Sequence, residues 1–419
     1  MPPTLSHFAS SLTTEIAFDV LAVVKRLQAA GKDVIGLQIG DSPFPSTAHA
    51  IAAGKAAIDA GHTRYGPSMG LPEFRETIAR MVNDEFDIPA TAANVVVGPG
   101  AKPFELFFCE AFLEPNDAVL VWQPTFPTFA PNILRRGAVP VYYPLLQSNH
   151  FRPNPSDVEH FLKTQPRAKA IFLNSPHNPT GGVATKEDLV AIAGLVRGKN
   201  IAVFSDEPYC HMVWEGQHRS ILAEPGMLDH AVSAFTFSKS YSMSGWRLGF
   251  AVASETVVQA MGKMINTTLS CVPPFVQLAG KAALENDHAE RDATMKKFHR
   301  KVELLVNELR TVDGMTVLMP PATFYVFPNV QPICDRLRIT SHGLAMYLLE
   351  GADDQRGVGC LGGECFGPAG AGFLRFSCAE TGERLVEAVG FIKDAITRTD
   401  RVEAYLTTRP EYRLLHPGE

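Results

Sequence analysis

The stretch Thr236-Phe-Ser-Lys-Ser-Tyr-Ser-Met-Ser-Gly-Trp-Arg247 continues an apolar run at residues 231–238. A run without polar alternation is typical of a strand buried on both faces of a sheet. Lys239 then lies at the strand end among small hydroxyl residues, where a lysine can form a Schiff base. Arg247 could hold a phosphate with both prongs of its guanidinium. A serine-rich surface loop is the alternative, but Trp246 and Arg247 beside an apolar run favour a binding site.

Similar apolar runs surround this one along the chain. They lie at residues 94–98, 118–124, 139–145, 170–176, 201–208 and 248–253. Helical patterns separate several of them, for example at residues 71–86, 104–113 and 186–196. Strands that alternate with helices indicate an α/β domain with helices packed on a mostly parallel sheet. We therefore predict a seven-stranded, mostly parallel sheet in a large domain at residues 46–285.

The rest of the chain predicts a smaller α+β domain that is discontinuous in sequence. It would comprise residues 1–45 together with residues 286–419. A long polar helix is expected at residues 289–311, a strand-rich part at 316–330 and a final helix at 382–397. Residues 401–419 show no clear periodicity. A chain of 419 residues suits two domains better than one compact core.

Composition excludes several classes of protein. The net charge of −6 favours neither a nucleic-acid partner nor an anionic membrane surface. We expect no membrane span, because no stretch is long and apolar enough, and no signal peptide. The seven cysteines are scattered without a C-x-x-C pair, which predicts no structural metal and a cytoplasmic protein. Metalloprotease, dinucleotide-binding and nucleophile-elbow motifs are missing from the sequence.

Polar residues follow three further apolar runs. Asp206 ends the run in Ile201-Ala-Val-Phe-Ser-Asp-Glu-Pro-Tyr209, where it could either cap a turn or meet a ligand. Asn178 lies in the rigid loop Asn174-Ser-Pro-His-Asn-Pro-Thr-Gly-Gly182. Gly98-Pro-Gly-Ala-Lys-Pro103 joins a strand to a helix, and such a turn can bind an anion through free backbone N–H groups. Ligands bind at the carboxyl ends of the strands in such sheets.

Taken in order, these motifs resemble those of class I and II aminotransferases of fold type I. Further matches are Ile39-Gly-Asp, Thr63-Arg-Tyr-Gly-Pro67 and Gly372-Phe-Leu-Arg-Phe376, so the resemblance spans residues 35–395. It implies a transaminase that uses pyridoxal 5′-phosphate (PLP) to move an amino group between an L-amino acid and a 2-oxo acid. A PLP-dependent lyase, synthase or oxidase on the same scaffold is the alternative. A DNA-binding regulator is disfavoured because no basic recognition helix precedes the sheet.

The resemblance also implies how the cofactor would be held. Lys239 would form the Schiff base and transfer protons, while Asp206 would pair with the pyridine nitrogen. The phenolic oxygen would be bound by Tyr209 and Asn178, and Phe126 would stack on the ring. The phosphate would be bound by the side chains of Thr236, Ser238 and Arg247, by the backbone of Gly100, Ala101 and Lys102, and by Tyr65 of the neighbouring subunit. A homodimer with shared active sites follows from the last contact.

Substrate-binding residues follow from the resemblance as well. Arg375 would bind the α-carboxylate near the backbone of Gly40, with Asn178 and Phe126 beside it. In bacterial aspartate aminotransferases with this glycine-rich turn, the lysine at the position of Lys102 meets the distal carboxylate of aspartate. A cation at a helix start is slightly unfavourable, which supports a role for Lys102. Aspartate or another dicarboxylate is the first choice, and aromatic or neutral amino acids are the alternative because Phe126 and Phe129 are apolar.

Overall fold

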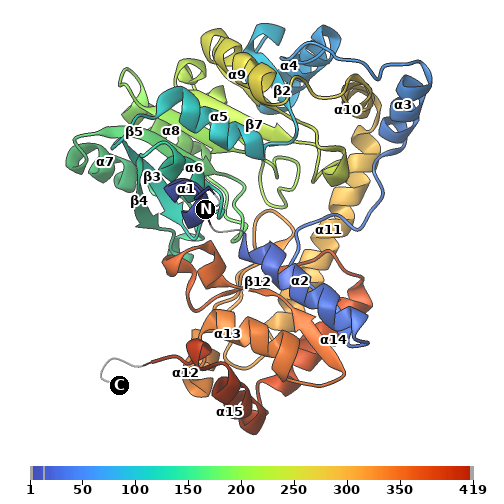
Figure 1. Ribbon diagram of the computed structural model, residues 1–419, viewed down its shortest axis with the longest axis vertical. Helices are drawn as coiled ribbons and strands as arrows, with labels where there is room; N and C mark the ends of the chain where they lie inside the picture. Colours follow the sequence, from blue (N-terminus) through green and yellow to red (C-terminus); the bar gives the residue numbers. More distant parts are fainter. Residues whose placement is uncertain (1–2, 13–14, 416–419) are drawn as a thin grey trace.

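The computed structural model describes residues 3–12 and 15–415, and a seven-stranded sheet dominates the upper part of Figure 1. The strands lie in the order β2-β8-β7-β6-β5-β3-β4. β8 runs antiparallel to both neighbours, and the other neighbouring pairs are parallel. The strands are β2 (Val95–Gly98), β3 (Ala118–Gln123), β4 (Val139–Pro144), β5 (Ala168–Asn174), β6 (Ala202–Asp206), β7 (Ala231–Thr236) and β8 (Gly249–Val252). Each corresponds to one of the seven apolar runs, so the predicted sheet is confirmed.

Burial of the strands follows their place in the sheet. Every residue of β2, β3, β6 and β8 is buried, as continuous apolar runs predict for strands covered on both faces. β4 differs because it is an edge strand, and its Val139 and Tyr142 are exposed. The apolar run at residues 139–145 therefore predicted the strand correctly but overstated its burial.

Helices pack on both faces of the large sheet, as Figure 1 shows. One face is covered by α5 (Lys102–Phe112), α6 (Phe129–Arg135) and α9 (Glu255–Thr268). The other face is covered by α4 (Pro72–Phe86), α7 (Pro155–Thr164) and α8 (Lys186–Val196). α3 (Ala48–Asp59) packs along α10 (Pro274–Asn286) at one end of this layer. The predicted helices at 71–86, 104–113 and 186–196 are α4, α5 and α8.

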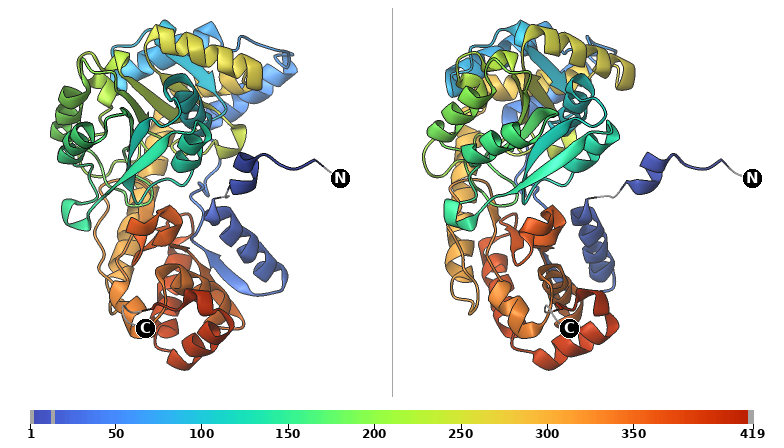
Figure 2. Two further views of the ribbon diagram at one scale, coloured as in Figure 1. Left: turned by 60° about the vertical axis from the view of Figure 1, so that its left-hand side comes forward. Right: turned by 90° about the vertical axis from the view of Figure 1, so that its left-hand side faces the viewer.

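A smaller part of the chain lies below the sheet in Figures 1 and 2, and α11 (His288–Leu309) leads down into it. Its N-terminal strand β1 (Asp33–Gly36) pairs in parallel with β10 (Arg356–Gly359). A separate antiparallel sheet contains β11 (Leu361–Gly362), β12 (Leu374–Ser377) and β9 (Tyr325–Val326). The helices around these strands are α2 (Ile16–Ala29), α12 (Gln331–Leu337), α13 (Ser341–Met346) and α14 (Gly382–Ala395), and α1 (His7–Ser11) begins the chain. The domain boundaries at 46 and 285 stay predictions.

Two expectations for the C-terminal part need correction. The region at residues 316–330 was expected to be rich in strands. Its described residues contain only the short strand β9 and isolated bridges, and the rest is loop. Residues 401–419 were expected to lack periodicity, yet α15 (Thr399–Thr408) buries Val402, Tyr405 and Leu406. The helix is too short for its apolar positions to stand out in the sequence. Residues 416–419 lie outside the described residues.

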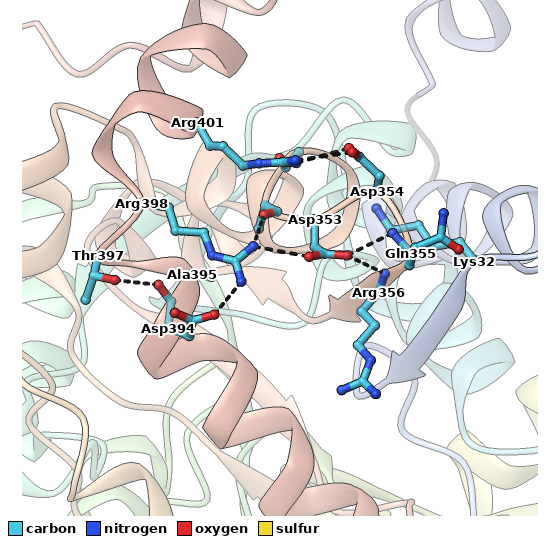
Figure 3. Close-up of polar contacts among 12 residues, drawn as sticks. Lys32, Asp353, Asp354, Gln355, Arg356, Asp394, Ala395, Thr397, Arg398 and Arg401 are labelled. Carbon is cyan, nitrogen blue, oxygen red and sulfur yellow. Dashed lines mark hydrogen bonds and ion pairs between the residues drawn. The ribbon is translucent and has the colours of Figure 1, made fainter.

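A network of charged residues fixes α15 to the turn before β10 (Figure 3). Arg398 donates to Asp353 at 3.2 Å and also pairs with Asp394, and Arg401 donates to Asp354 at 3.0 Å. The backbone N–H of Gln355 donates to Asp353 at 2.8 Å. These contacts hold α14, α15 and the turn together. Across residues 3–12 and 15–415, no helix is long and apolar enough to cross a bilayer.

Candidate active site

A cavity of about 340 Å³ opens at the carboxyl ends of β5, β6 and β7. Parallel strands bring their following loops to one edge of the sheet, and this is where ligands bind in such folds. All but one of the residues singled out from the sequence line it. They are Gly40, Gly100, Ala101, Lys102, Phe126, Asn178, Asp206, Tyr209, Thr236, Ser238, Lys239, Arg247 and Arg375. Tyr65 is the exception, because its side chain is 89% exposed and lies outside the cavity lining.

Lys239 lies in the loop that follows β7, as the sequence predicted. Its Nζ donates a hydrogen bond of 2.5 Å to the backbone oxygen of Gly40 and lies 5.8 Å from the ring centre of Phe324. Gly40 belongs to the loop after β1, so this contact joins the large sheet to the N-terminal segment. The amine therefore donates to a backbone carbonyl rather than to a carboxylate.

Asp206 is the last residue of β6 and is buried in the wall of the cavity. The side-chain amide of Asn174 donates to its Oδ2 at 3.2 Å and to its backbone oxygen at 2.8 Å. Burial, followed by the charge of the neighbouring Glu207, raises the pKa of Asp206 to about 7. A cation beside this carboxyl would favour its ionised form. The site is therefore suited to a ligand that brings a protonated nitrogen to Asp206.

Tyr209 meets a residue that the sequence did not single out. Its hydroxyl lies 3.1 Å from the hydroxyl of Tyr325, which also lines the cavity. Burial raises the pKa of Tyr209 well above its ordinary value. Gly40 passes so close to this pair that a Cβ at that position would overlap the Tyr325 hydroxyl. Tyr325 lies in the two-residue strand β9, which leaves too short a pattern to reveal it.

The glycine-rich turn before α5 forms a cradle with the loop after β7. Gly100 has a φ of 95°, and a Cβ there would lie 2.7 Å from Nη2 of Arg247. Arg247 donates to the backbone oxygens of Pro99 at 2.9 Å and Ser244 at 2.8 Å. The hydroxyls of Thr236 and Ser238 lie 2.8 Å apart beside it. Hydroxyls, a guanidinium and a helix start together make a site for a phosphate.

Arg375 enters the cavity from β12 and is only 4% exposed. Its Nη1 donates to Asn178 Oδ1 at 3.0 Å, and its Nη2 donates to the backbone oxygen of Gln38 at 2.5 Å. Its Nε has no hydrogen-bond partner among the described residues. A surface salt bridge, the alternative role for this arginine, is therefore excluded. A buried guanidinium with a free N–H needs an anion, and a carboxylate offers two acceptors in matching geometry.

The cavity wall near Asp206 carries a second set of charged groups. Lys102, the first residue of α5, forms an ion pair with Glu15, and its Nζ lies 5.2 Å from the ring centre of Phe126. Glu105 lies one turn further along α5 and is buried. Its Oε2 accepts from Thr128 at 2.5 Å and from Asn132 at 3.2 Å. Burial and then the charge of Asp206 raise the pKa of Glu105 well above its ordinary value.

Glu15 and Glu105 were both missed by the sequence interpretation. Glu105 leaves a signal, because it is an acidic residue among phenylalanines on a helix that follows a candidate binding turn. Glu15 leaves none, since it meets Lys102 only through the folding of the N-terminal segment onto the large domain.

Comparison with known proteins agrees with this geometry. The family model "Aminotransferase class I and II" matches residues 32–392. Aspartate aminotransferase of Pyrococcus abyssi is 34% identical over 366 residues, which cover 86% of this chain and 91% of that protein. The probable aspartate/prephenate aminotransferase of Aquifex aeolicus is 34% identical over 399 residues, covering 94% and 97% of the two chains.

A solved structure extends the agreement to the fold. Aspartate aminotransferase from Thermus thermophilus with maleate has a TM-score of 0.88 and 29% identity, covering 94% of this chain and 100% of that one. The similarity thus includes both the large sheet and the smaller part. The chain belongs to the class I and II aminotransferase family and is a transaminase, and this family implies pyridoxal phosphate as the cofactor.

Proposed function

We propose that this transaminase binds PLP at Lys239 and moves an amino group between aspartate, or another dicarboxylic amino acid, and a 2-oxo acid. The observation that carries the proposal is the cavity itself, where Lys239, Asp206 and Arg375 converge from three separate elements. The family match alone leaves the substrate open. The positions of Lys102 and Arg375 at two places in one cavity support a substrate with two carboxylates.

The residues present fit PLP. Gly100 lies so close to Arg247 that an added carbon would approach the guanidinium too closely, so the backbone of the turn and this cation can face the same phosphate. Arg247, Thr236, Ser238 and the backbone at residues 100–102 would hold that phosphate. Asp206 would pair with the ring nitrogen, and the raised pKa of this buried carboxyl would fall as the pair forms. Tyr209 and Asn178 would contact the phenolic oxygen, and Phe126 would lie on the ring.

The chain's own groups would then position the substrate and move its proton. Arg375 would bind the α-carboxylate through the guanidinium that is now incompletely satisfied. Lys239 Nζ would take the proton from the α-carbon, since it is an amine that lines the cavity. Bound PLP would supply the electron sink that makes this carbon acidic. Lys102 would bind the side-chain carboxylate of the substrate.

A homodimer and a cytoplasmic location complete the proposal. The Tyr65 side chain is almost fully exposed and can reach a second copy, which supports a contact with the phosphate site of that copy. All seven cysteines are unpaired, which supports a reducing compartment. Sedimentation analysis of the holoenzyme would reveal the dimer. Tyr65→Phe should then weaken PLP binding while the protein stays dimeric. A monomeric holoenzyme would contradict the proposed homodimer.

An absorption titration tests the function. The purified protein with PLP should show a visible band that is absent in Lys239→Ala. Aspartate should bleach the band, and a 2-oxo acid should restore it. A band that no amino acid bleaches would instead favour a lyase or oxidase. A protein without any band after PLP is added would contradict the proposed cofactor.

Aromatic or neutral amino acids are the second candidate. Phe126, Phe18, Ile39 and Ala17 line the same cavity, and Lys102 already has a partner in Glu15. Both features would suit an uncharged side chain. Bleaching by phenylalanine at lower concentrations than by aspartate would favour this candidate.

A further inference from the structure

Glu15 and Lys102 come from different elements that both line the active-site cavity. Glu15 immediately precedes α2, whereas Lys102 begins α5 of the large sheet layer. The two side chains form an ion pair, and both line the cavity together with Ala17, Phe18 and Phe126. Figure 2 shows the N-terminal segment on the side where the upper and lower parts of the molecule meet. The chain therefore places one of its own carboxylates in the substrate cavity.

This carboxylate has the same chemistry as the side chain of a dicarboxylic substrate. Its partner Lys102 is 45% exposed and Glu15 is 16% exposed, so a ligand in the cavity can reach the ammonium. The start of α2 adds the positive end of a helix beside Glu15, which favours a negative charge there. Among the described residues, no second cation forms a salt bridge with Glu15. A substrate carboxylate arriving at Lys102 would thus meet the Glu15 carboxylate already in place.

We propose that Glu15 is a specificity-determining residue whose carboxylate holds the place at Lys102 that the distal carboxylate of an acidic substrate would take. The inference rests on the proposed role of Lys102 in the transaminase. Two carboxylates beside one ammonium repel each other, so an acidic substrate binds only by displacing Glu15 or against its charge. A substrate with an uncharged side chain leaves the ion pair intact. Glu15 therefore lowers the preference of the enzyme for dicarboxylates over neutral substrates.

Glu105 is a second carboxyl group near Lys102. Glu105 follows Lys102 on α5 and is buried in the same cavity wall. Its oxygen is held by Thr128 and Asn132 rather than by a cation. Burial raises the pKa of Glu105, so the Glu15 carboxylate is the group that balances the charge of Lys102 before any substrate binds.

Binding of two amine-free ligands to the PLP-loaded enzyme tests the inference. Maleate carries two carboxylates, whereas 3-phenylpropionate carries one and an apolar ring. Their Kd values would be measured by calorimetry and by the shift in cofactor absorbance. Glu15→Gln keeps the shape of the side chain and removes its charge. We expect it to tighten maleate binding about tenfold, equal to ~1.4 kcal/mol, and to change 3-phenylpropionate binding less than threefold.

Glu76→Gln is the matched control, because it removes one exposed carboxylate on α4 outside the cavity. Both Kd values should stay at the wild-type level in this variant. Glu15→Ala should shift maleate in the same direction as Glu15→Gln, which separates charge from side-chain size. Unchanged or weaker maleate binding in Glu15→Gln, or equal tightening of both ligands, would overturn the inference.

Lys102→Ala separates this inference from the proposed function. Weaker maleate binding in Lys102→Ala together with an unchanged Kd in Glu15→Gln would overturn only the role of Glu15. An unchanged Kd for maleate in Lys102→Ala would overturn both the dicarboxylate assignment and the role of Glu15. The KM for aspartate should fall in Glu15→Gln while the KM for phenylalanine stays within threefold, and the reverse pattern would count against the proposal.

Discussion

Carboxylates in two regions of the molecule have opposite properties. In the active-site cavity, Asp206 and Glu105 are buried and burial raises the pKa of each. In the turn before β10, shown in Figure 3, Asp353 is half-buried, Asp354 is exposed, and the pKa of each is lowered. The Asp353 carboxylate accepts from the backbone N–H of Gln355 and from Arg398, and the Asp354 carboxylate accepts from Arg401.

The difference separates charges that hold structure from charges kept for a ligand. The turn before β10 satisfies its carboxylates inside the chain, so nothing further needs to bind there. The cavity leaves a raised pKa at Asp206 and an unpartnered N–H at Arg375, and both are costs to folding that a ligand removes. At Asp206 and Arg375, the incompletely satisfied groups therefore mark where a ligand would bind in this cavity.

The largest difference in kcat should be found between substitutions of one lysine in each region, Lys239 and Lys32. Lys239→Ala removes the amine that would hold the cofactor and move the substrate proton, so we expect kcat to fall on the order of 10⁴-fold. Lys32→Ala is the counterpart near the turn, where Lys32 Nζ donates to the backbone oxygen of Glu350 at 3.0 Å. It should leave kcat unchanged and lower only Tm. Steady-state kinetics and thermal melting compare them, and similar kcat values for the two variants would remove the distinction.

A smaller effect should follow from changing one arginine in each region. Arg375→Lys loses the planar fork that would meet the substrate α-carboxylate, and we expect kcat/KM to fall about 100-fold. Arg398→Lys changes the same residue type within the network of Figure 3. Here kcat/KM should stay within twofold while Tm falls by a few degrees. An equal loss of kcat/KM in both variants would mean that Arg375 acts only through stability.

The pH dependence of stability should have opposite signs in the two regions. The pKa of Asp206 is raised to about 7, so between about pH 4 and 7 the folded protein binds the proton that the unfolded chain has lost. Stability from this group therefore falls as pH rises through that window. In the cofactor-free enzyme, Asp206→Asn should have a Tm close to wild type at pH 5 and roughly 2 °C above it at pH 8.

The matching variant for this test is Asp353→Asn. Asp353 has a lowered pKa, so its contribution is present above about pH 4 and is lost as pH falls through the lower folded value. Its Tm should lie below wild type at pH 5 and at pH 8 alike. Melting curves across this range check both variants, and a Tm difference for Asp206→Asn that does not vary with pH would contradict the raised pKa.

The smallest effect is expected at the edge of the charge network. Asp354→Asn breaks one exposed ion pair with Arg401, and exposed pairs contribute little because water and salt screen them. Tm should change by less than about 1 °C, and this small difference should vanish in 1 M NaCl. A larger loss would show that Arg401 positions α15.

Sequence patterns predicted the large sheet for physical reasons, and the residues singled out at its strand ends line one cavity. Strands buried on both faces need continuous apolar runs, and side chains that meet a ligand follow directly at their ends. Asp206, Asn178 and Lys239 were found in this way. Residues in the smaller part were harder to predict, because β9 has only two residues and α15 only a short apolar face. Tyr325 and Glu15 reach the cavity through long-range contacts that no local pattern encodes.

The parallel pairing of β1 with β10 has a consequence for the order in which the protein is made. Residues 33–36 leave the ribosome early, but their partners at residues 356–359 follow only after the whole large sheet has been synthesised. The large sheet can therefore fold first. Until β10 is made, β1 keeps an unpaired edge through which it can associate with other chains. Arg375 lies in β12, which follows β10 along the chain and is synthesised later still. A nascent chain thus has no complete active site until its C-terminal strands have emerged.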